Sequence, residues 1–482
     1  MNRLLLAVVV SLLFTGLLSA QTLSPEVRAF VKSDAPVVAL THVRVIDGTG
    51  APAQQDQTIV ISQGKIQSLG STGSVTIPLG AQTIDLTGHS VIPGLVGMHD
   101  HMFYPAGDAI FHEMAISFPR LYLAGGVTTI RTTGSIEPYT DLSIKQDIDA
   151  GKVPGPHMHV TGPYLEGPET WGPQLTRLKT PQEAVDTVNY WIDRGVDNFK
   201  AYNFISRQVL GAAIQAAHKR GIKVTGHLCS IGFREAAALG IDDLEHGLLV
   251  DTEFFSGKKP DQCPDENAVV TELVKMHVSD APIQETIRDL VAHHVALTST
   301  LPVFELLAPD KTPLQRRVLD AMSEEAGNQY LATRVRIDLP QKDPKTGTPV
   351  PDIWTAGFKM EMEFEHAFAD AGGLLLAGPD PTGIGGDLAG FGDQREVELL
   401  VEEGFTPVQA IHIATSNGAQ YLGELNRIGT IASGKQADLV VVKGDPSTKV
   451  DDIENVETVF KDGIGYDSAK LIESVKGLVG IR

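Results

Sequence analysis

Two histidines separated by one residue stand at the end of an apolar, glycine-rich run. His99 and His101 follow the segment 91–98, and residues i and i+2 of a strand share one face. Their imidazoles can therefore bind one metal ion, because imidazole is the commonest metal ligand in proteins. The same spacing recurs at His157 and His159. The pattern alone does not identify the site.

Short apolar segments alternate with amphipathic stretches through the middle of the chain, which is typical of repeated βα units. We expect strands at 91–98, 127–132, 157–162, 197–202, 222–228, 241–246, 295–299 and 374–380. Helices are expected at 113–125, 181–194, 206–220, 230–239, 283–293, 355–371 and 393–403. Eight strands over about 300 residues predict an α/β fold, a (β/α)8 TIM barrel with insertions.

Both ends of the chain carry short β-rich runs separated by turns. Residues 37–92 and 426–482 together predict a small β-sandwich domain, which leaves 93–425 for the barrel domain. The segments 251–282 and 301–354 are longer than ordinary connections and follow strand ends. We expect both to form lids or substrate walls over the barrel mouth.

The carboxyl ends of the expected strands carry six potential metal ligands. In chain order these are His99 and His101 on the first strand, Lys200 on the fourth, His227 on the fifth, His246 on the sixth and Asp380 on the eighth. Each one alone has a structural explanation, as a core histidine, a surface cation or a helix cap. Because these strand ends meet at one mouth, the set favours a metal centre. His157 and His159 come early on the third strand and should face the opposite end.

Composition limits the class of partner. The 482 residues hold 39 Lys and Arg against 60 Asp and Glu, a formal net charge of −21. A chain without a dense basic cluster has little attraction for phosphate backbones or anionic lipid headgroups. We therefore expect no nucleic acid and no membrane partner. A small-molecule substrate is expected from the ligand cluster rather than from the charge, and a homo-oligomer is possible.

The first twenty residues resemble a secretory leader, with an early arginine, an apolar run and small residues before Gln21. We predict a signal peptide at 1–20 and an exported protein, periplasmic or secreted; an uncleaved N-terminal anchor is the alternative. Cys229 and Cys263 are the two cysteines of the chain. An exported protein can join them in a disulfide, which stays a hypothesis because pairing depends on geometry.

The motifs around these ligands resemble the amidohydrolase superfamily, in the branch with imidazolonepropionase and the metal-dependent Xaa-Pro dipeptidases. The resemblance rests on His99-Asp100-His101, Lys200, Thr225-Gly226-His227, Leu244-Glu245-His246-Gly247 and Ala377-Gly378-Pro379-Asp380. Flanking matches lie at 127–131, 404–415 and 429–439. Gly97 departs from the pattern, since the family usually carries aspartate two residues before the first ligand histidine.

The resemblance implies a site for two divalent metal ions. Lys200 would be carboxylated by CO2 and bridge them, since a carbamate offers two oxygens where an ammonium offers none. His99, His101 and Asp380 would hold one ion, and His227 with His246 the other. Zinc is favoured, and manganese, cobalt or iron stay open. A hydroxide bridging the ions would attack the carbonyl, and Asp380 would carry its proton to the leaving amine.

These features predict an exported binuclear metal-dependent amidohydrolase that cleaves the amide bond of N-acyl amino acids or dipeptides. Tyr104, Arg131 and Tyr202 are candidate substrate contacts, and arginine suits a carboxylate. A cyclic amide or lactone hydrolase is the alternative within enzymes. A non-catalytic metal-binding surface protein is the alternative of another class, which would not need Asp380 as a proton carrier.

Overall fold

The computed structural model describes residues 23–106, 110–170, 172–309, 313–342 and 346–481. The predicted signal peptide at 1–20 lies outside these residues. Within them, no helix combines the length and the apolar composition needed to cross a bilayer.

Eight parallel strands form the centre of the fold. They are β7 (Leu95–Asp100), β10 (Val127–Thr132), β11 (His157–His159), β14 (Asn198–Ala201), β15 (Lys223–Gly226), β16 (Asp243–Glu245), β17 (Ala296–Ser299) and β18 (Leu375–Ala377). The first three pair in the order β11-β10-β7, and the other five pair consecutively from β14 to β18. Neighbouring strands are thus mostly neighbours in the chain, as βα units require. Strand β10 has the predicted bounds and the other strands are shorter than predicted, while the candidate ligands lie in or after the last residues of their strands.

Contacts at two seams connect these groups of strands. Thr161 bridges to Asn198 in parallel register between β11 and β14, and Gly162 N–H donates to the Asn198 carbonyl at 2.9 Å. At the other seam, Asp380 N–H donates to the His99 carbonyl at 3.0 Å. A Cβ on Gly378 would lie 2.1 Å from the His99 nitrogen, so glycine permits this approach of β18 to β7.

Helices follow most of these strands. They are α2 (Ser117–Gly125), α3 (Pro138–Asp149), α4 (Pro181–Ile192), α5 (Arg207–His218), α6 (Phe233–Leu239), α8 (Ala281–Ala292), α12 (Trp354–Asp370) and α13 (Phe391–Glu403). The seven expected helices are present, with one correction at 113–125. There Ile110–Glu113 forms strand β9, which pairs with β8 (Phe103–Ala106), so α2 begins at Ser117. Helix α3 was not predicted.

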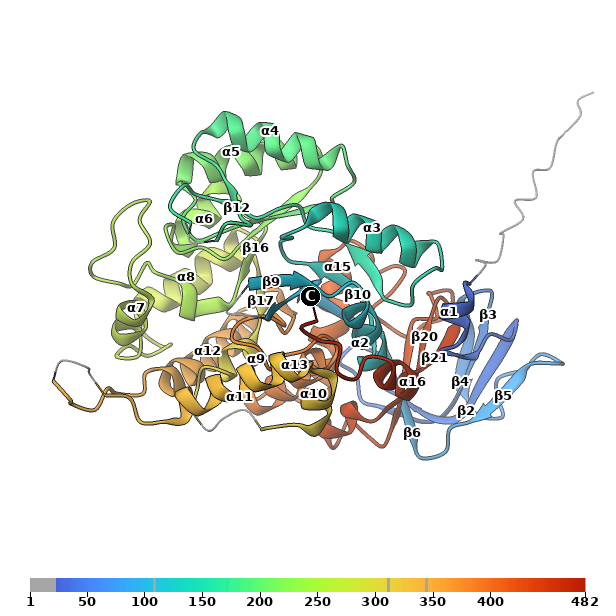
Figure 1. Ribbon diagram of the computed structural model, residues 1–482. Coiled ribbons are helices and arrows are strands. Elements are labelled where there is room, and N and C mark those ends of the chain that lie inside the picture. Colours follow the sequence, from blue (N-terminus) through green and yellow to red (C-terminus); the bar gives the residue numbers. More distant parts are fainter. Residues whose placement is uncertain (1–22, 107–109, 171, 310–312, 343–345, 482) are drawn as a thin grey trace, which may run out of the picture.

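Strands from both ends of the chain share one nine-stranded sheet. It contains β1 (Val31–Ser33), β2 (Val37–Val45), β3 (Gln54–Ser62), β4 (Lys65–Ser71), β5 (Gln82–Asp85), β6 (His89–Pro93), β19 (Leu439–Lys443), β20 (Val456–Lys461) and β21 (Ile464–Asp467). In Figure 1 the blue strands β2–β5 lie at one side of the molecule with the red β20 and β21 nearby. Buried side chains from both ends, such as Leu40 and Leu439, form their own core.

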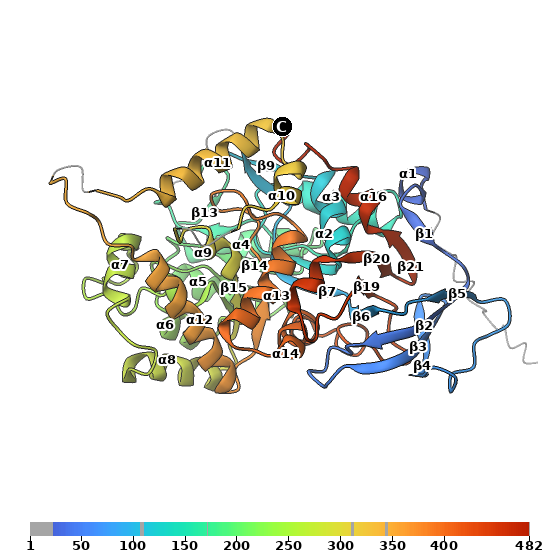
Figure 2. The same ribbon diagram turned by 90° about the horizontal axis from the view of Figure 1, so that it is seen from below.

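The long segments after β16 and β17 contain helices of their own. These are α7 (Glu266–Leu273) in the first, and α9 (Leu301–Glu305), α10 (Arg316–Ala321) and α11 (Glu324–Asp338) in the second. In Figures 1 and 2, α7 lies at the side of the molecule away from β2–β4. The remaining elements are β12 (Leu165–Glu166), β13 (Thr176–Arg177), α1 (Pro25–Arg28), α14 (Pro407–His412), α15 (Gly418–Tyr421), α16 (Ser468–Glu473), the 3-10 helices at Gly247–Val250 and Val450–Glu454, and a π-helical turn at Ile413–Asn417.

Cys229 and Cys263 form a disulfide, as hypothesised from the sequence. The bond joins the loop after β15 to the loop before α7. It therefore ties the first long segment to the end of a central strand.

Candidate active site

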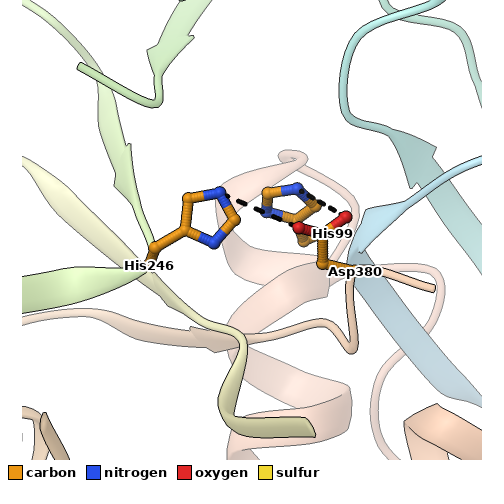
Figure 3. Close-up of side chains that lie close together, drawn as sticks. All are labelled: His99, His246 and Asp380. Atoms are coloured by element: carbon orange, nitrogen blue, oxygen red, sulfur yellow. Dashed lines mark ion pairs between the residues drawn. The ribbon is translucent and has the colours of Figure 1, made fainter. Parts of the chain in front are cut away.

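The six predicted ligands converge at the carboxyl ends of five central strands. His99 Nε2 lies 3.6 Å from Asp380 Oδ1, and His101 Nε2 lies 3.0 Å from the same oxygen. His246 Nε2 lies 3.9 Å from Asp380 Oδ2. Figure 3 shows His99 and His246 pointing at the two oxygens of the Asp380 carboxylate. The carboxylate is thus the common neighbour of three imidazoles.

His227 and Lys200 complete the cluster, the first beside His246 and the second beside His99. The ring centroids of His227 and His246 are 4.3 Å apart, and Lys200 Nζ lies 3.0 Å from His99 Nε2. Lys200 is 1% exposed. Among the described residues, no carboxylate forms an ion pair with its amine. A buried lysine without an acidic partner is unfavourable as an ammonium ion.

Backbone strain marks two of the ligand positions. His246 and Asp380 adopt left-handed φ angles of 70° and 54°. Non-glycine residues rarely adopt this conformation, and it recurs where surrounding structure holds a functional side chain in place. His246 follows β16 directly and Asp380 comes three residues after the end of β18, so a turn after each short strand directs the side chain into the cluster.

An acidic residue that the sequence analysis did not single out orients His99. Glu245 Oε2 lies 2.6 Å from His99 Nδ1, so it accepts that N–H and leaves the Nε2 lone pair free toward Asp380 and Lys200. Thr300 Oγ1 lies 2.8 Å from His246 Nδ1 and holds that ring similarly. The signal for Glu245 was an acidic side chain inside a buried strand, directly before a ligand histidine.

A largely apolar cavity of about 570 Å³ opens above the cluster. His101, Lys200, His227, His246 and Asp380 form part of its lining, with Tyr164 and Tyr202 beside them. Both long segments contribute to its walls, the first through Glu266 and the second through Val303, Phe304 and Leu307. The predicted role of these segments as substrate walls agrees with this placement.

The donor set fits divalent metal ions. The ligand atoms of His99, His246 and Asp380 all lie within 4.8 Å of one another. His246 Nε2 is buried and has no hydrogen-bond partner, which is costly unless another group satisfies it. Four imidazoles with a carboxylate suit zinc and neighbouring transition metals better than calcium or magnesium.

A family model decides the relationship: the amidohydrolase family model matches residues 90–464, more than half of the chain. The chain belongs to the amidohydrolase family. The resemblance stated from its motifs is therefore confirmed at the level of the family.

Solved structures agree with this assignment in fold. A putative prolidase from Bifidobacterium longum superposes with a TM-score of 0.64 at 24% identity, covering 91% of this chain and 98% of that one. A Xaa-Pro dipeptidase with methionine bound in its active site gives a TM-score of 0.65 at 21% identity, covering 89% of this chain and 100% of that one. At these identities the likeness concerns the fold.

Curated relatives match over shorter stretches. A dihydroorotase of Trichlorobacter lovleyi is 35% identical over 101 residues, 20% of this chain and 22% of that protein. The matched segments cover between 19% and 55% of the lengths of such relatives. The chain thus matches less than two thirds of the length of each of these relatives.

Arg131, a predicted substrate contact, is not among the described residues that line the cavity of this amidohydrolase. Its guanidinium is fully buried and forms ion pairs with Asp243 at 2.8 Å and Glu245 at 3.0 Å, while Nε donates to the Met98 carbonyl. Strand alternation turns the Arg131 side chain toward residues of β7 and β16 rather than into the cavity. Its role is to fix Glu245, and through it His99.

Tyr104 is likewise not among the described residues that line the cavity, whereas Tyr202 is one of them. Tyr104 is 1% exposed, and its hydroxyl accepts from Gly386 N–H at 2.9 Å. Strand β8 diverges from β7 to pair with β9, which carries Tyr104 away from the metal cluster. Tyr202 packs edge-on against His227, with ring centroids 4.9 Å apart.

Burial keeps the imidazoles of the cluster neutral. Burial, the largest cause, holds the pKa of His99 and that of His246 well below the usual value. Burial lowers the pKa of His227 to about 3. Burial also lowers the pKa of Lys200, which favours the neutral amine that reacts with CO2. Neutral imidazoles and a neutral amine are the forms that ligation and carboxylation require.

Asp100 occupies the space in which the family usually carries an aspartate at position 97. A Cβ added to Gly97 would lie 1.8 Å from Asp100 Oδ2 and 2.9 Å from Asp393 Oδ1. Burial, and then the charge of Asp393, raise the pKa of Asp100 well above its usual value. The absence of a side chain at Gly97 therefore leaves room for the Asp100 carboxyl group.

Gly97→Ala should lower the free energy of unfolding by about 1–3 kcal/mol, because the added methyl group overlaps Asp100. Gly97→Ala/Asp100→Ala should recover part of the loss, since the second change removes the overlapping carboxyl group. Urea unfolding of the two variants measures this. Equal stabilities for the single and double variants would contradict the coupling.

His157 and His159 lie apart from the metal cluster, as expected. His159 Nδ1 lies 3.0 Å from Asp197, and its Nε2 lies 3.5 Å from Glu424. Burial would lower the pKa of His159, but the hydrogen bonds that its ring donates to the carboxylates of Asp197 and Glu424 raise it to about 9. The His159 hydrogen bond lowers the pKa of Glu424 to about 2. This histidine is charged at neutral pH and serves stability.

His159→Gln should destabilise the protein more at pH 6 than at pH 10. The folded pKa of about 9 lies above the unfolded value of about 6.5, so the ion pairs stabilise fully below pH 6.5. That stability is lost as pH rises through 9. We expect a loss of about 1–2 kcal/mol at pH 6, discounted because the partners are partly exposed. Urea titrations at both pH values test this, with the exposed His293→Gln as control; a loss independent of pH would contradict it.

Proposed function

We propose that this protein is an exported, binuclear metal-dependent hydrolase that cleaves the amide bond of dipeptides or N-acyl amino acids. The observation that carries the proposal is the convergence of four imidazoles, one carboxylate and one unpaired buried lysine on the floor of an apolar cavity. Family membership supports hydrolysis of a carbon–nitrogen bond.

We also propose that the chain forms a closed barrel and a β-sandwich domain. The eight parallel strands would close as a (β/α)8 barrel within residues 93–425, supported by the hydrogen bonds at both seams. Residues 37–92 and 426–482 would form the β-sandwich domain, supported by their shared sheet and core. The site would then lie at the carboxyl-end mouth, where barrels of this type position their chemistry.

His99, His101 and Asp380 would hold one ion, His227 and His246 the other, and carboxylated Lys200 would bridge them. When bound, two such ions supply Lewis acidity and lower the pKa of water. Glu245 fixes the tautomer of His99, and Thr300 fixes the ring of His246. Zinc is the metal that this donor set favours.

Asp380 is positioned for proton transfer. Its Oδ1 accepts from Thr382 Oγ1 at 3.0 Å and faces His101, while the residue lines the cavity. The carboxylate would take a proton from the attacking water and deliver it to the leaving nitrogen. The apolar walls exclude bulk water, which strengthens these electrostatic interactions.

Export rests on two features of the chain. The leader-like composition of residues 1–20 agrees with secretion. The disulfide between Cys229 and Cys263 agrees with an oxidising compartment. Fractionation of producing cells, with N-terminal sequencing of the mature protein, tests this part; an intact leader on a protein recovered with reduced thiols would overturn it.

Metal analysis combined with a hydrolysis screen tests the activity. Purified protein should contain two divalent ions per chain and hydrolyse members of a panel of dipeptides and N-acyl amino acids. Turnover confined to lactones or cyclic imides would replace the proposal by the ring-opening alternative. Metal-replete protein without turnover on any compound of the panel would favour a metal-binding role.

A further inference from the structure

The cavity above the cluster is built for an apolar body. Aromatic and aliphatic side chains from several loops form its walls, among them Phe111, Ile136, Leu175, Val303, Phe304 and Ile384. Burial of apolar substrate surface against such walls contributes about 25 cal/mol per Å². The walls therefore favour a substrate with apolar groups.

Among the residues that the structure describes, one charged side chain lines the cavity apart from the proposed ligands. It is Glu266, and no arginine or second lysine among the described residues lines the cavity. Glu266 is exposed to solvent and forms no ion pair within that part of the chain. A carboxylate without a cation of its own can pair with a cation brought by a ligand.

A disulfide and a helix-capping hydrogen bond hold the start of α7, the helix that carries Glu266. It is the first residue of α7, and Asp265 caps that helix by accepting from Ala268 N–H at 2.9 Å. The disulfide from Cys263 reaches Cys229, two residues after His227. The disulfide thus ties the segment just before Glu266 to the loop after β15, close to the proposed metal ligand His227.

The helix terminus does not offer an alternative site for an anion. The two acidic side chains at its start already complement the partial positive charge of the helix. A substrate carboxylate near this position would meet both Asp265 and Glu266 and be repelled. The local field therefore favours a positive group.

We propose that Glu266 binds a positively charged group of the substrate, so that the enzyme prefers apolar amides carrying a free ammonium or guanidinium group. This rests on the proposed amide hydrolysis and narrows it, since N-acyl amino acids bear only a negative terminus. Peptides with a free amino group or a basic side chain fit the cavity better.

Three ligands of one scaffold test this on metal-loaded protein: phenylalanyl-leucine amide, its N-acetyl derivative, and N-acetyl-phenylalanyl-leucine. They carry charges of +1, 0 and −1. Calorimetry gives their dissociation constants, and chromatography of products gives kcat/KM. Glu266→Gln should weaken the cationic ligand about 5-fold and tighten the anionic one, leaving the neutral one within about 2-fold. Glu266→Lys should reverse the order of preference.

Glu272→Gln is the matched control, because it removes a charge from the same helix while its amide oxygen can still accept from Ser256. Equal responses to both variants, or equal changes for all three ligands, would overturn the assignment of Glu266. Binding shifts without hydrolysis would support Glu266 and reject the proposed function. Hydrolysis without a charge-dependent shift would do the reverse, and absence of all binding would reject both.

Discussion

Lys200→Ala is expected to lose both metal ions and turnover. The side chain lies 3.0 Å from His99 Nε2 on the floor of the cavity, and the proposed carbamate is the group that joins the two halves of the cluster. Its loss should cost more than the roughly 10–100-fold that removal of an outer partner costs. Metal content by mass spectrometry and kcat/KM on the best substrate of the panel measure the effect.

A short carboxylic acid such as acetate or formate should partly restore metal and activity to Lys200→Ala. The deleted side chain leaves space in which two carboxylate oxygens can replace those of the carbamate. Lys223→Met is the control, since Lys223 lies at the start of the neighbouring strand and contacts the Tyr421 carbonyl. Two retained ions and a full rate in Lys200→Ala would show that the lysine is not the bridge.

The positions of the candidate ligands could be predicted because they follow from the alternation of strands and helices along the chain. Apolar runs mark the central strands, and strand ends in βα units share one edge, so His99 and His246 were placed together without distances. Helices with strong periodicity, such as α5 and α12, were also predictable. Each of these helices buries one apolar face, so its apolar residues recur with the period of a helix.

The roles of Arg131, Tyr104 and Glu245 depend on tertiary contacts that a sequence does not contain. Arg131 follows the same strand logic as the ligands, but Asp243 and Glu245 on another strand neutralise it inside the fold. Tyr104 is only three residues from His101, yet β8 pairs with β9 and turns it away. Helix α3 was missed because its residues show little separation of apolar and polar faces.

The surroundings of Gly97 show how the fold accommodates a departure from the family pattern at this position. At the sequence level, Gly97 removes an expected acidic neighbour of the first histidine. In the fold, the carboxyl group of Asp100 fills that space, while Glu245 orients His99 from another strand. The support of the ligand is therefore distributed over residues distant in the chain.

Asp380→Asn is expected to lower kcat by about 10²–10⁴-fold, the usual contribution of a positioned acid–base group. Asparagine preserves the shape and an oxygen that can accept from Thr382, but it cannot carry a proton. Activity should be measured at saturating metal, so that weakened metal binding is separated from loss of proton transfer. The acidic limb of the pH–rate profile should disappear with the carboxylate.

Asp387→Asn supplies the matched control for this change. Burial, and then the charge of Asp393, raise the pKa of Asp387 well above its usual value, which disfavours its charged form, and the amide is nearly isosteric with the protonated carboxyl group. We expect little change in kcat for this variant. If Asp380→Asn retained full turnover and metal affinity, Asp380 would not be the proton carrier. If neither variant nor the parent turned over any amide while all bound metal equally, the cluster would be a storage site, because such a site needs donor atoms but no residue that moves a proton.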